Sequence, residues 1–130
     1  MADFEDEDFR GAVFQACAMA DVTFDDVNMA DSRFINTNLQ RTKFTDLNLS
    51  GTAYSEANIE RANFRTSTLA HTTFDDVDMS DITFTNVNFQ RGKFTDVNLS
   101  GVVIDDANID GLTILGHDIK ALIDAEVARK

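Results

Sequence analysis

Acidic side chains in adjacent pairs, two histidines and one cysteine are the residues of this sequence whose types suit chemistry. They are Asp25-Asp26, Asp75-Asp76, Asp105-Asp106, His71, His117 and Cys17. Paired carboxylates can bind Ca²⁺ or act as general acid and base. The histidines lie far apart and neither belongs to a ligand-spaced cluster. The sequence also lacks a glycine-rich phosphate loop, a G-x-S-x-G motif and a Cys-x-x-Cys motif.

The Asp-Asp pairs recur in equivalent places of a repeat, which favours solvated corners over a site. The nonapeptide glycine pattern of calcium-binding β-rolls is absent. We therefore predict a protein that is not an enzyme, with no catalytic residue, no metal ligand and no cofactor. A metal-binding enzyme fragment is kept as a remote alternative.

The elements that carry these residues are set by a period of five. Every fifth residue from Phe4 to Ile119 is large and apolar, and all eleven phenylalanines lie in this series. Two residues earlier stands, at most positions, a small or β-branched residue, such as Val22, Ala57 or Val87. Residues two apart on an extended segment point to the same side. Each pentad is thus predicted to be one short extended side with two inward residues, followed by a polar corner.

This pattern resembles the pentapeptide-repeat family, whose motif reads A-(D/N)-(L/F)-x-x. The best matches are Ala57-Asn58-Ile59-Glu60-Arg61, Ala62-Asn63-Phe64-Arg65-Thr66 and Ala107-Asn108-Ile109-Asp110-Gly111. The resemblance implies an all-β fold, a right-handed quadrilateral parallel β-helix with four pentads per coil and about five to six coils. We assign residues 1–116 to this β-helix, which leaves the central apolar residues stacked in four columns.

The C-terminal segment, residues 117–130, is predicted to form a short α-helix. Asp118 is a suitable N-cap, and four apolar residues follow at helical spacing. These are Ile119, Leu122, Ile123 and Val127. Solenoids need their exposed ends covered, so one interpretation is a cap packed on the last coil. The other is a dimerisation helix, as in gyrase-binding members of the family. The protein is accordingly expected to be a monomer or a homodimer joined through an end of the rod.

Function is expected on the outward residues, which are strongly acidic. The formal net charge is −12, from 23 acidic and 11 basic residues. The column around Phe4 carries eight acidic and two basic residues, the highest excess of the four columns. We take its acidic members as a candidate interaction face: Asp3, Glu5, Asp6, Asp25, Asp26, Asp46, Asp105 and Asp106. A surface of this sign argues against nucleic-acid binding and is compatible with a basic protein partner.

Two functions remain open besides the enzyme fragment. The first is a non-catalytic scaffold or protein-interaction module. The second is implied by the resemblance, because some family members mimic DNA and bind DNA gyrase or another topoisomerase. A rod of about 28 Å would match duplex DNA carrying about 16 charges. The predicted repeat, however, has no loop interrupting it, unlike several of the mimics.

The composition indicates the cellular compartment that we expect for the protein. No apolar run approaches the length of a membrane span, and the N-terminal residues are acidic rather than those of a signal peptide. The single cysteine fits a reducing environment. We expect a cytoplasmic protein without a membrane partner.

Overall fold

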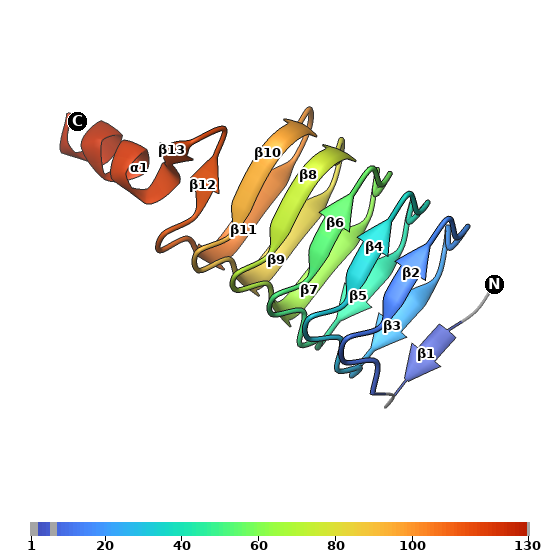
Figure 1. The fold of residues 1–130 in the computed structure, drawn as a ribbon. Coiled ribbons are helices and arrows are strands. Elements are labelled where there is room, and N and C mark those ends of the chain that lie inside the picture. The colour runs from blue at the N-terminus through green and yellow to red at the C-terminus, as the bar shows by residue number, and fades with distance from the viewer. Residues whose placement is uncertain (1–2, 6–7, 130) are drawn as a thin grey trace.

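The protein folds as a solenoid of short parallel strands followed by one helix (Figure 1). The computed structural model describes residues 3–5 and 8–129, and side chains from residue 8 onward. One sheet has six strands: β1 (Asp3–Glu5), β3 (Thr23–Asp25), β5 (Lys43–Thr45), β7 (Asn63–Thr68), β9 (Thr83–Asn88) and β11 (Val103–Asn108). The other has seven strands: β2 (Val13–Gln15), β4 (Arg33–Ile35), β6 (Ala53–Ser55), β8 (Thr73–Asp78), β10 (Lys93–Asn98), β12 (Thr113–Ile114) and β13 (His117–Asp118). The helix is α1 (Ile119–Ala128).

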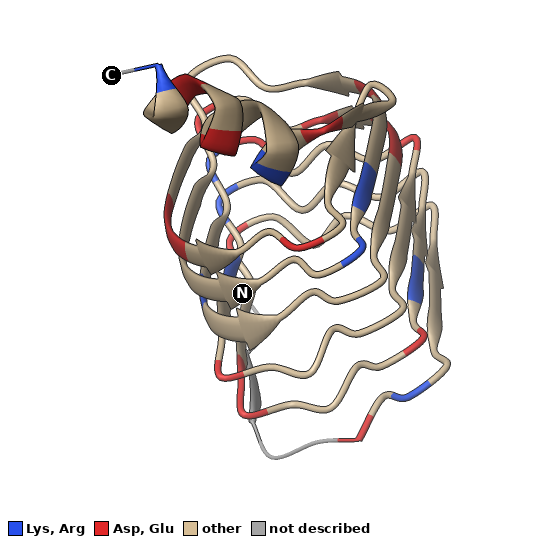
Figure 2. Cartoon of the chain, turned by 90° about the vertical axis from the view of Figure 1, so that its left-hand side faces the viewer, with Lys and Arg blue, Asp and Glu red and all other residues tan. Residues whose placement is uncertain are grey.

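The strands pair in a register of twenty residues, so four pentads make one coil. Phe24 pairs with Phe44 and Phe44 with Phe64 in one sheet, while Phe34 pairs with Tyr54 in the other. All these pairs are parallel. The predicted pentapeptide β-helix is confirmed as a β-solenoid of about five turns with a short C-terminal helix. Figure 2 shows the coils lying one above another, each with flattened sides joined by corners.

The interior of the rod is filled by the residues of the five-residue series. Phe44 and Phe64 stack with ring centroids 4.3 Å apart and an interplanar angle of 4°. In the other aromatic column, Tyr54 and Phe74 stack at 4.5 Å and 1°. The small residues two positions earlier, such as Ala62 and Val77, are buried as well. Offset stacking adds to the gain from apolar burial, and the filled axis leaves the outer surface as the place for function.

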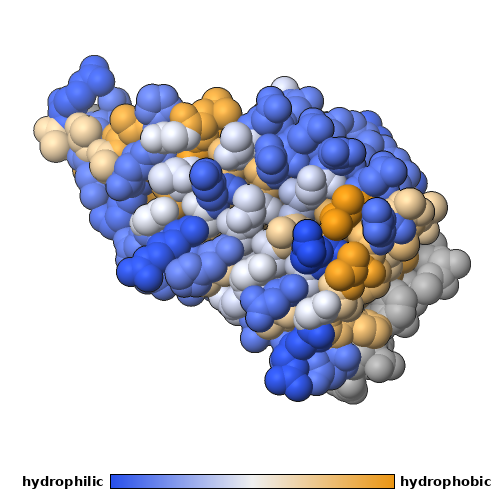
Figure 3. All heavy atoms as spheres, in the orientation of Figure 1, coloured by the Kyte–Doolittle hydropathy of each residue, from blue (hydrophilic) through white to orange (hydrophobic). Residues whose placement is uncertain are grey.

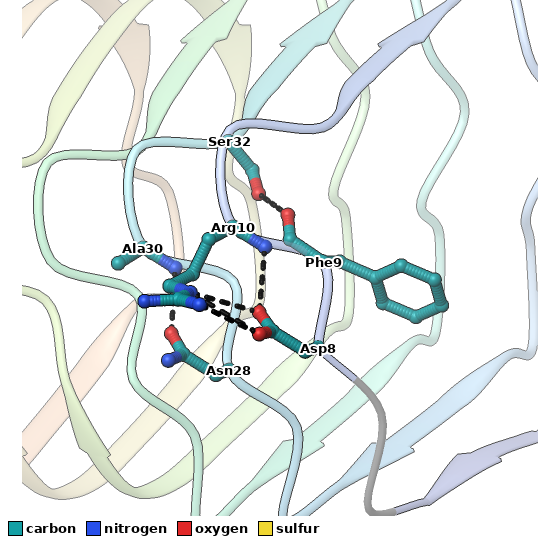
Figure 4. Close-up of polar contacts among 6 residues, drawn as sticks. All are labelled: Asp8, Phe9, Arg10, Asn28, Ala30 and Ser32. Carbon is teal, nitrogen blue, oxygen red and sulfur yellow. Dashed lines mark hydrogen bonds and ion pairs between the residues drawn. The ribbon is translucent and has the colours of Figure 1, made fainter.

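Two local features turn the chain at the corners. The second residue after the central apolar one has positive φ, as in Asp26 (55°) and Glu56 (52°). At alternate corners the residue before the central one caps the turn: Asn28 Oδ1 accepts a hydrogen bond from Ala30 N at 3.1 Å (Figure 4). Asp8 Oδ1 accepts from Arg10 N in the same way at 3.2 Å. An Asx side chain that satisfies a turn amide in this manner explains the Asn or Asp of the repeat motif.

Tyr54 is the one departure from phenylalanine in the middle of its aromatic column. Its ring is 1% exposed, and among the described residues its Oη is the only buried side-chain polar atom without a hydrogen-bond partner. Burial raises the pKa of Tyr54 well above its ordinary value, and a contact with Thr52 offsets only part of this rise. The Thr52 hydroxyl donates its own proton to Leu49 O at 2.8 Å. The phenol is therefore held neutral at a cost in solvation.

We expect Tyr54→Phe to raise the free energy of unfolding by about 1 kcal/mol, because an unpaired buried polar group costs about 1–3 kcal/mol. The raised pKa also means that the unfolded chain ionises first as pH rises. Stability is therefore complete below the unfolded pKa of about 10 and falls above it. Tyr54→Phe should not show the part of the stability loss at alkaline pH that comes from ionisation of Tyr54. Urea melts of both proteins at neutral and alkaline pH measure the two effects. A less stable Tyr54→Phe would show that the hydroxyl has a partner.

The C-terminal end departs from the parallel stack. β13 pairs antiparallel with β12, and Asp118 Oδ1 caps α1 by accepting from Ala121 N at 3.1 Å. The helix then leaves the end of the rod (Figure 1). None of its residues is buried, and Leu122, Ile123 and Val127 are exposed by 56%, 47% and 63%.

Leu122, Ile123 and Val127 therefore do not pack on the last coil as a cap would, and the role of the helix as cap or dimerisation element stays a prediction. Only Ile119, at the start of α1, packs partly against the core. The physical reason is the reversal of direction at β13, which sends the helix away from the coil end. Over the described residues, no helix is both long and apolar enough to cross a membrane.

Candidate surface for protein recognition

Polar side chains line the outward corners of this rod, and the structure splits the acidic face expected from the sequence. Asp25 and Asp26 lie at the end of β3, and Asp46 lies one coil further at the end of β5. Asp105 and Asp106 lie in β11, separated from that group by two coils. The face is therefore two acidic ends rather than one surface.

Basic residues further divide this face. Lys43 occupies an outward position of β5, in the same coil as Asp46, and Arg65 occupies one of β7, between the two acidic ends. Both side chains are exposed. Asp3 and Glu5 lie in β1, where only the backbone is described, and Asp6 lies outside the described residues.

A groove lies on a different side of the rod. It spans four coils, has a volume of about 630 Å³ and is lined by Ala16, Cys17, Ala18, Asn36, Thr37, Asn38, Glu56, Ala57, Asn58, Asp76 and Asp78. We call this the acidic groove. Its floor is made of small side chains, and Thr37 and Ala57 are 3% and 5% exposed. None of these lining residues is Lys or Arg. The hollow exists because small residues sit inward of two rows of larger polar ones.

Three carboxylates form a row along one wall of this groove and beyond it. Glu56, Asp76 and Asp96 occupy the same corner position in successive coils, and all three are exposed. Sequence reasoning missed this row because it grouped residues by the neighbouring apolar column and summed their charge. A spacing of twenty between like charges was the signal that would have found it.

Ion pairs neutralise several acidic residues elsewhere on the surface. Arg41 Nε lies 2.8 Å from Asp21 Oδ1, across one coil step. Hydrogen bonding to this guanidinium holds the pKa of Asp21 below its ordinary value. Arg10 does the same to the pKa of Asp8, at 3.0 Å. Among the described residues, no ion pair involves the three carboxylates of the row.

The residues first considered for chemistry are dispersed. His71 is an exposed corner residue with φ of 61°, and His117 is exposed in β13. Asp75 and Asp76 lie in β8, and Cys17 is partly buried at one end of the groove, where its Sγ donates to Gln15 O at 3.3 Å. Within residues 8–129, no three His, Cys, Asp or Glu side chains come together in a way that could hold a metal ion.

Comparison with known proteins agrees with the register of the coils. The family described as a pentapeptide repeat region matches residues 1–74, and the family described as pentapeptide repeats (8 copies) matches residues 62–101 and 82–113. The chain belongs to the pentapeptide-repeat family. No curated protein matches the sequence significantly.

Several solved pentapeptide-repeat proteins are similar to this chain. One is from the thylakoid lumen of Arabidopsis thaliana, with 19% identity, a TM-score of 0.49, and coverage of 93% of this chain and 76% of that one. Rfr23 from the cyanobacterium Cyanothece 51142 has 11% identity and a TM-score of 0.44, over 80% and 90%. QnrB1, a plasmid-mediated fluoroquinolone resistance protein, has 9% identity and a TM-score of 0.33, over 100% and 98%.

Proposed function

We propose that this protein is a non-catalytic interaction module, a rigid rod that presents acidic surfaces to a protein partner. The observation that carries the proposal is the contrast between interior and surface. The interior side chains stack without leaving room for a substrate, whereas the corners carry rows of polar residues. Proteins of the pentapeptide-repeat family are generally structural or interaction modules, which supports this reading.

The charge of the surface indicates the kind of partner. The net charge of −12 favours a partner with a basic surface, because complementary charge accelerates encounter and selects against acidic proteins. The same charge opposes binding to nucleic acid. The single cysteine indicates a reducing compartment, so we propose that the partner is a cytoplasmic protein.

A second candidate, a DNA-mimicking modulator of a topoisomerase, is favoured by the stacking of carboxylates. Glu56, Asp76 and Asp96 follow one another at the coil spacing of about 4.8 Å, which gives a linear row of negative charge. DNA gyrase then becomes the first purified protein to examine as a partner, with inhibition of supercoiling as the readout.

We also propose that a second copy of this chain is a partner. Leu122, Ile123 and Val127 form an uncovered apolar stripe on α1, and Ile104 at the end of the last coil is 38% exposed. In Figure 3, apolar spheres lie near this end of the molecule and also towards the N-terminal end, whereas much of the visible face is hydrophilic. Apolar surface of this kind is stabilised by pairing with another apolar surface.

Charge reversal tests the proposed module. We expect Asp25→Lys, Asp26→Lys and Asp46→Lys together to abolish capture of a basic partner from a lysate of the source organism while leaving the fold intact. The reason is that the reversal removes one acidic end and replaces it with positive charge. Pull-downs of both proteins, with purified gyrase as a defined arm, measure the effect, and circular dichroism checks the fold. Equal capture by the reversed protein would show that this end only keeps the rod soluble.

A further inference from the structure

The acidic groove combines a hollow with two kinds of unused hydrogen-bonding group. Its floor follows Cys17, Thr37 and Ala57 through successive coils. The Thr37 hydroxyl is turned inward, where it donates to Phe14 O at 3.1 Å and Ile35 O at 2.8 Å. The floor is therefore small and offers no free donor. The four coils that line the groove extend over about 14 Å, the length of about four extended residues.

The backbone of this side of the rod is already paired. Asn38 N donates to Cys17 O at 2.9 Å, and Asn58 N donates to Thr37 O at 3.0 Å. Asn36 N likewise donates to Ser55 O at 2.9 Å. A ligand in the groove therefore cannot add to the sheet as a new strand, so recognition must use side chains.

One set of wall side chains presents donors. Asn38 Oδ1 accepts from Gln40 N and Asn58 Oδ1 accepts from Glu60 N, each at 3.0 Å. Because the amide oxygens are occupied by the corner turns, the Nδ2 groups remain available to a ligand. Neither Nδ2 has an acceptor among the described residues. Two donors one coil apart, about 4.8 Å, can each donate to a carbonyl oxygen of a ligand.

The other set presents unpaired negative charge. Glu56 and Asp76 are exposed and lie in adjacent coils, and no cation of the described chain pairs with them. Like charges stacked one coil apart repel each other, so a bound cation relieves this repulsion. Asp78 contributes a third carboxylate, which also accepts from Ser80 N at 3.1 Å.

A second groove on the rod carries less negative charge, with Asp106 as the single carboxylate in its lining. It has a volume of about 490 Å³ and is lined by Thr66, Ser67, Thr68, Asn86, Val87, Asn88, Asp106, Ala107 and Asn108. The repeat thus hollows the rod here as well, and asparagine walls occur at both of these grooves. Only the acidic groove carries a row of carboxylates along its wall, which makes the second groove an internal control.

We propose that the acidic groove binds a short extended segment of a partner protein that is rich in Lys and Arg. The cationic head groups pair with Glu56 and Asp76, and the peptide carbonyls accept from Asn38 and Asn58. The inference rests on the proposed function as an interaction module and assigns to it one site and one class of partner. A basic extended segment suits the site better than a folded basic surface, because the groove runs across four coils and its floor residues Thr37 and Ala57 are buried.

A labelled probe peptide tests this directly. The probe is a peptide of about eight residues alternating Lys and Ser, about twice the length that the groove accommodates. An equivalent peptide with Glu in place of Lys is the control. Fluorescence anisotropy should show saturable, salt-sensitive binding of the Lys peptide and none of the Glu peptide. Glu56→Gln with Asp76→Asn should weaken the affinity about tenfold, as expected for the loss of two charge-assisted contacts.

The matched variant is Asp105→Asn with Asp106→Asn beside the second groove, which removes the same charge. It should change the affinity by less than about twofold, because exposed distant charges are screened at physiological salt. Cys17 supplies an independent readout, since a bound peptide should slow its alkylation by iodoacetamide. Spermine in place of the peptide shows whether charge alone suffices.

The outcomes separate the groove from the wider proposal. Equal weakening by both double variants, or tight spermine binding with no preference for peptide, would overturn the groove and leave an acidic interaction surface. Saturable binding that leaves Cys17 alkylation unchanged would also place the peptide elsewhere. The absence of saturable Lys peptide binding at low salt would overturn the groove and count against a basic partner.

Discussion

Phe64→Ala should lower the free energy of unfolding by about 3–5 kcal/mol, the range for deleting a buried aromatic ring. Phe64 is 0% exposed and stacks between Phe44 at 4.3 Å and Phe84 at 5.0 Å. Removing it empties the axis of the rod at mid-length and breaks two ring contacts at once. Neighbouring coils cannot collapse into the gap, because their backbones are held at the parallel strand spacing. Chemical denaturation followed by circular dichroism measures the loss.

The adjacent residue is the control for this variant. Arg65 is exposed on the same strand, β7, and Arg65→Ala should cost under about 0.5 kcal/mol. The pair of neighbours thus reports which residues point inward. Comparable losses for the two variants would show that the register of inward and outward residues is misassigned.

Truncation after Gly116 should turn a soluble protein into an aggregating one. The cut removes β13, which is the antiparallel partner that covers the edge of β12, and Ile119, which packs partly on the core. Both the strand edge and the apolar end of the last coil then become available to other molecules, and such edges template pairing. Static light scattering on the purified proteins shows the change.

A variant of the helix stripe separates the role of the C-terminal segment in covering the edge of β12 from its role in dimerisation. Leu122→Asp with Ile123→Asp leaves β13 and Ile119 in place and makes the exposed stripe polar. We expect the intact protein to run as a dimer and this variant as a soluble monomer of similar stability. A truncated protein that stays soluble, monomeric and equally stable would contradict both roles of the C-terminal segment.

The fold was predictable because the five-residue period is long and unbroken. A slip of one residue would bring charged outward residues such as Arg65 into the axis in place of Phe64, so only one register is possible. The buried small residues, such as Ala62, followed from the same alternation. The corner turns could also be predicted, because Asn28 and its equivalents occupy a fixed place in the motif.

The surface and the C-terminal end were less predictable, for separate reasons. The expected acidic face combined Asp25 with Asp105, although stacking by twenty residues places them several coils apart. The shape of the acidic groove depends on which floor residues are small, such as Ala57. Its free donors depend on which wall asparagines have their Oδ1 atoms bonded to turn amides. The helix stripe was correctly placed in α1, but the amphipathic pattern carries no information on the reversal at β13 that directs it outward.

The central claim is that recognition lies on the acidic surface of a rod whose stability comes from its filled interior. It is tested most directly by measuring peptide affinity and thermal midpoint together for wild type and for Glu56→Gln with Asp76→Asn. The account predicts an affinity about tenfold weaker with a midpoint unchanged or slightly raised, because a pair of stacked like charges is removed. A midpoint that falls together with the affinity, or an affinity that stays the same, would contradict it.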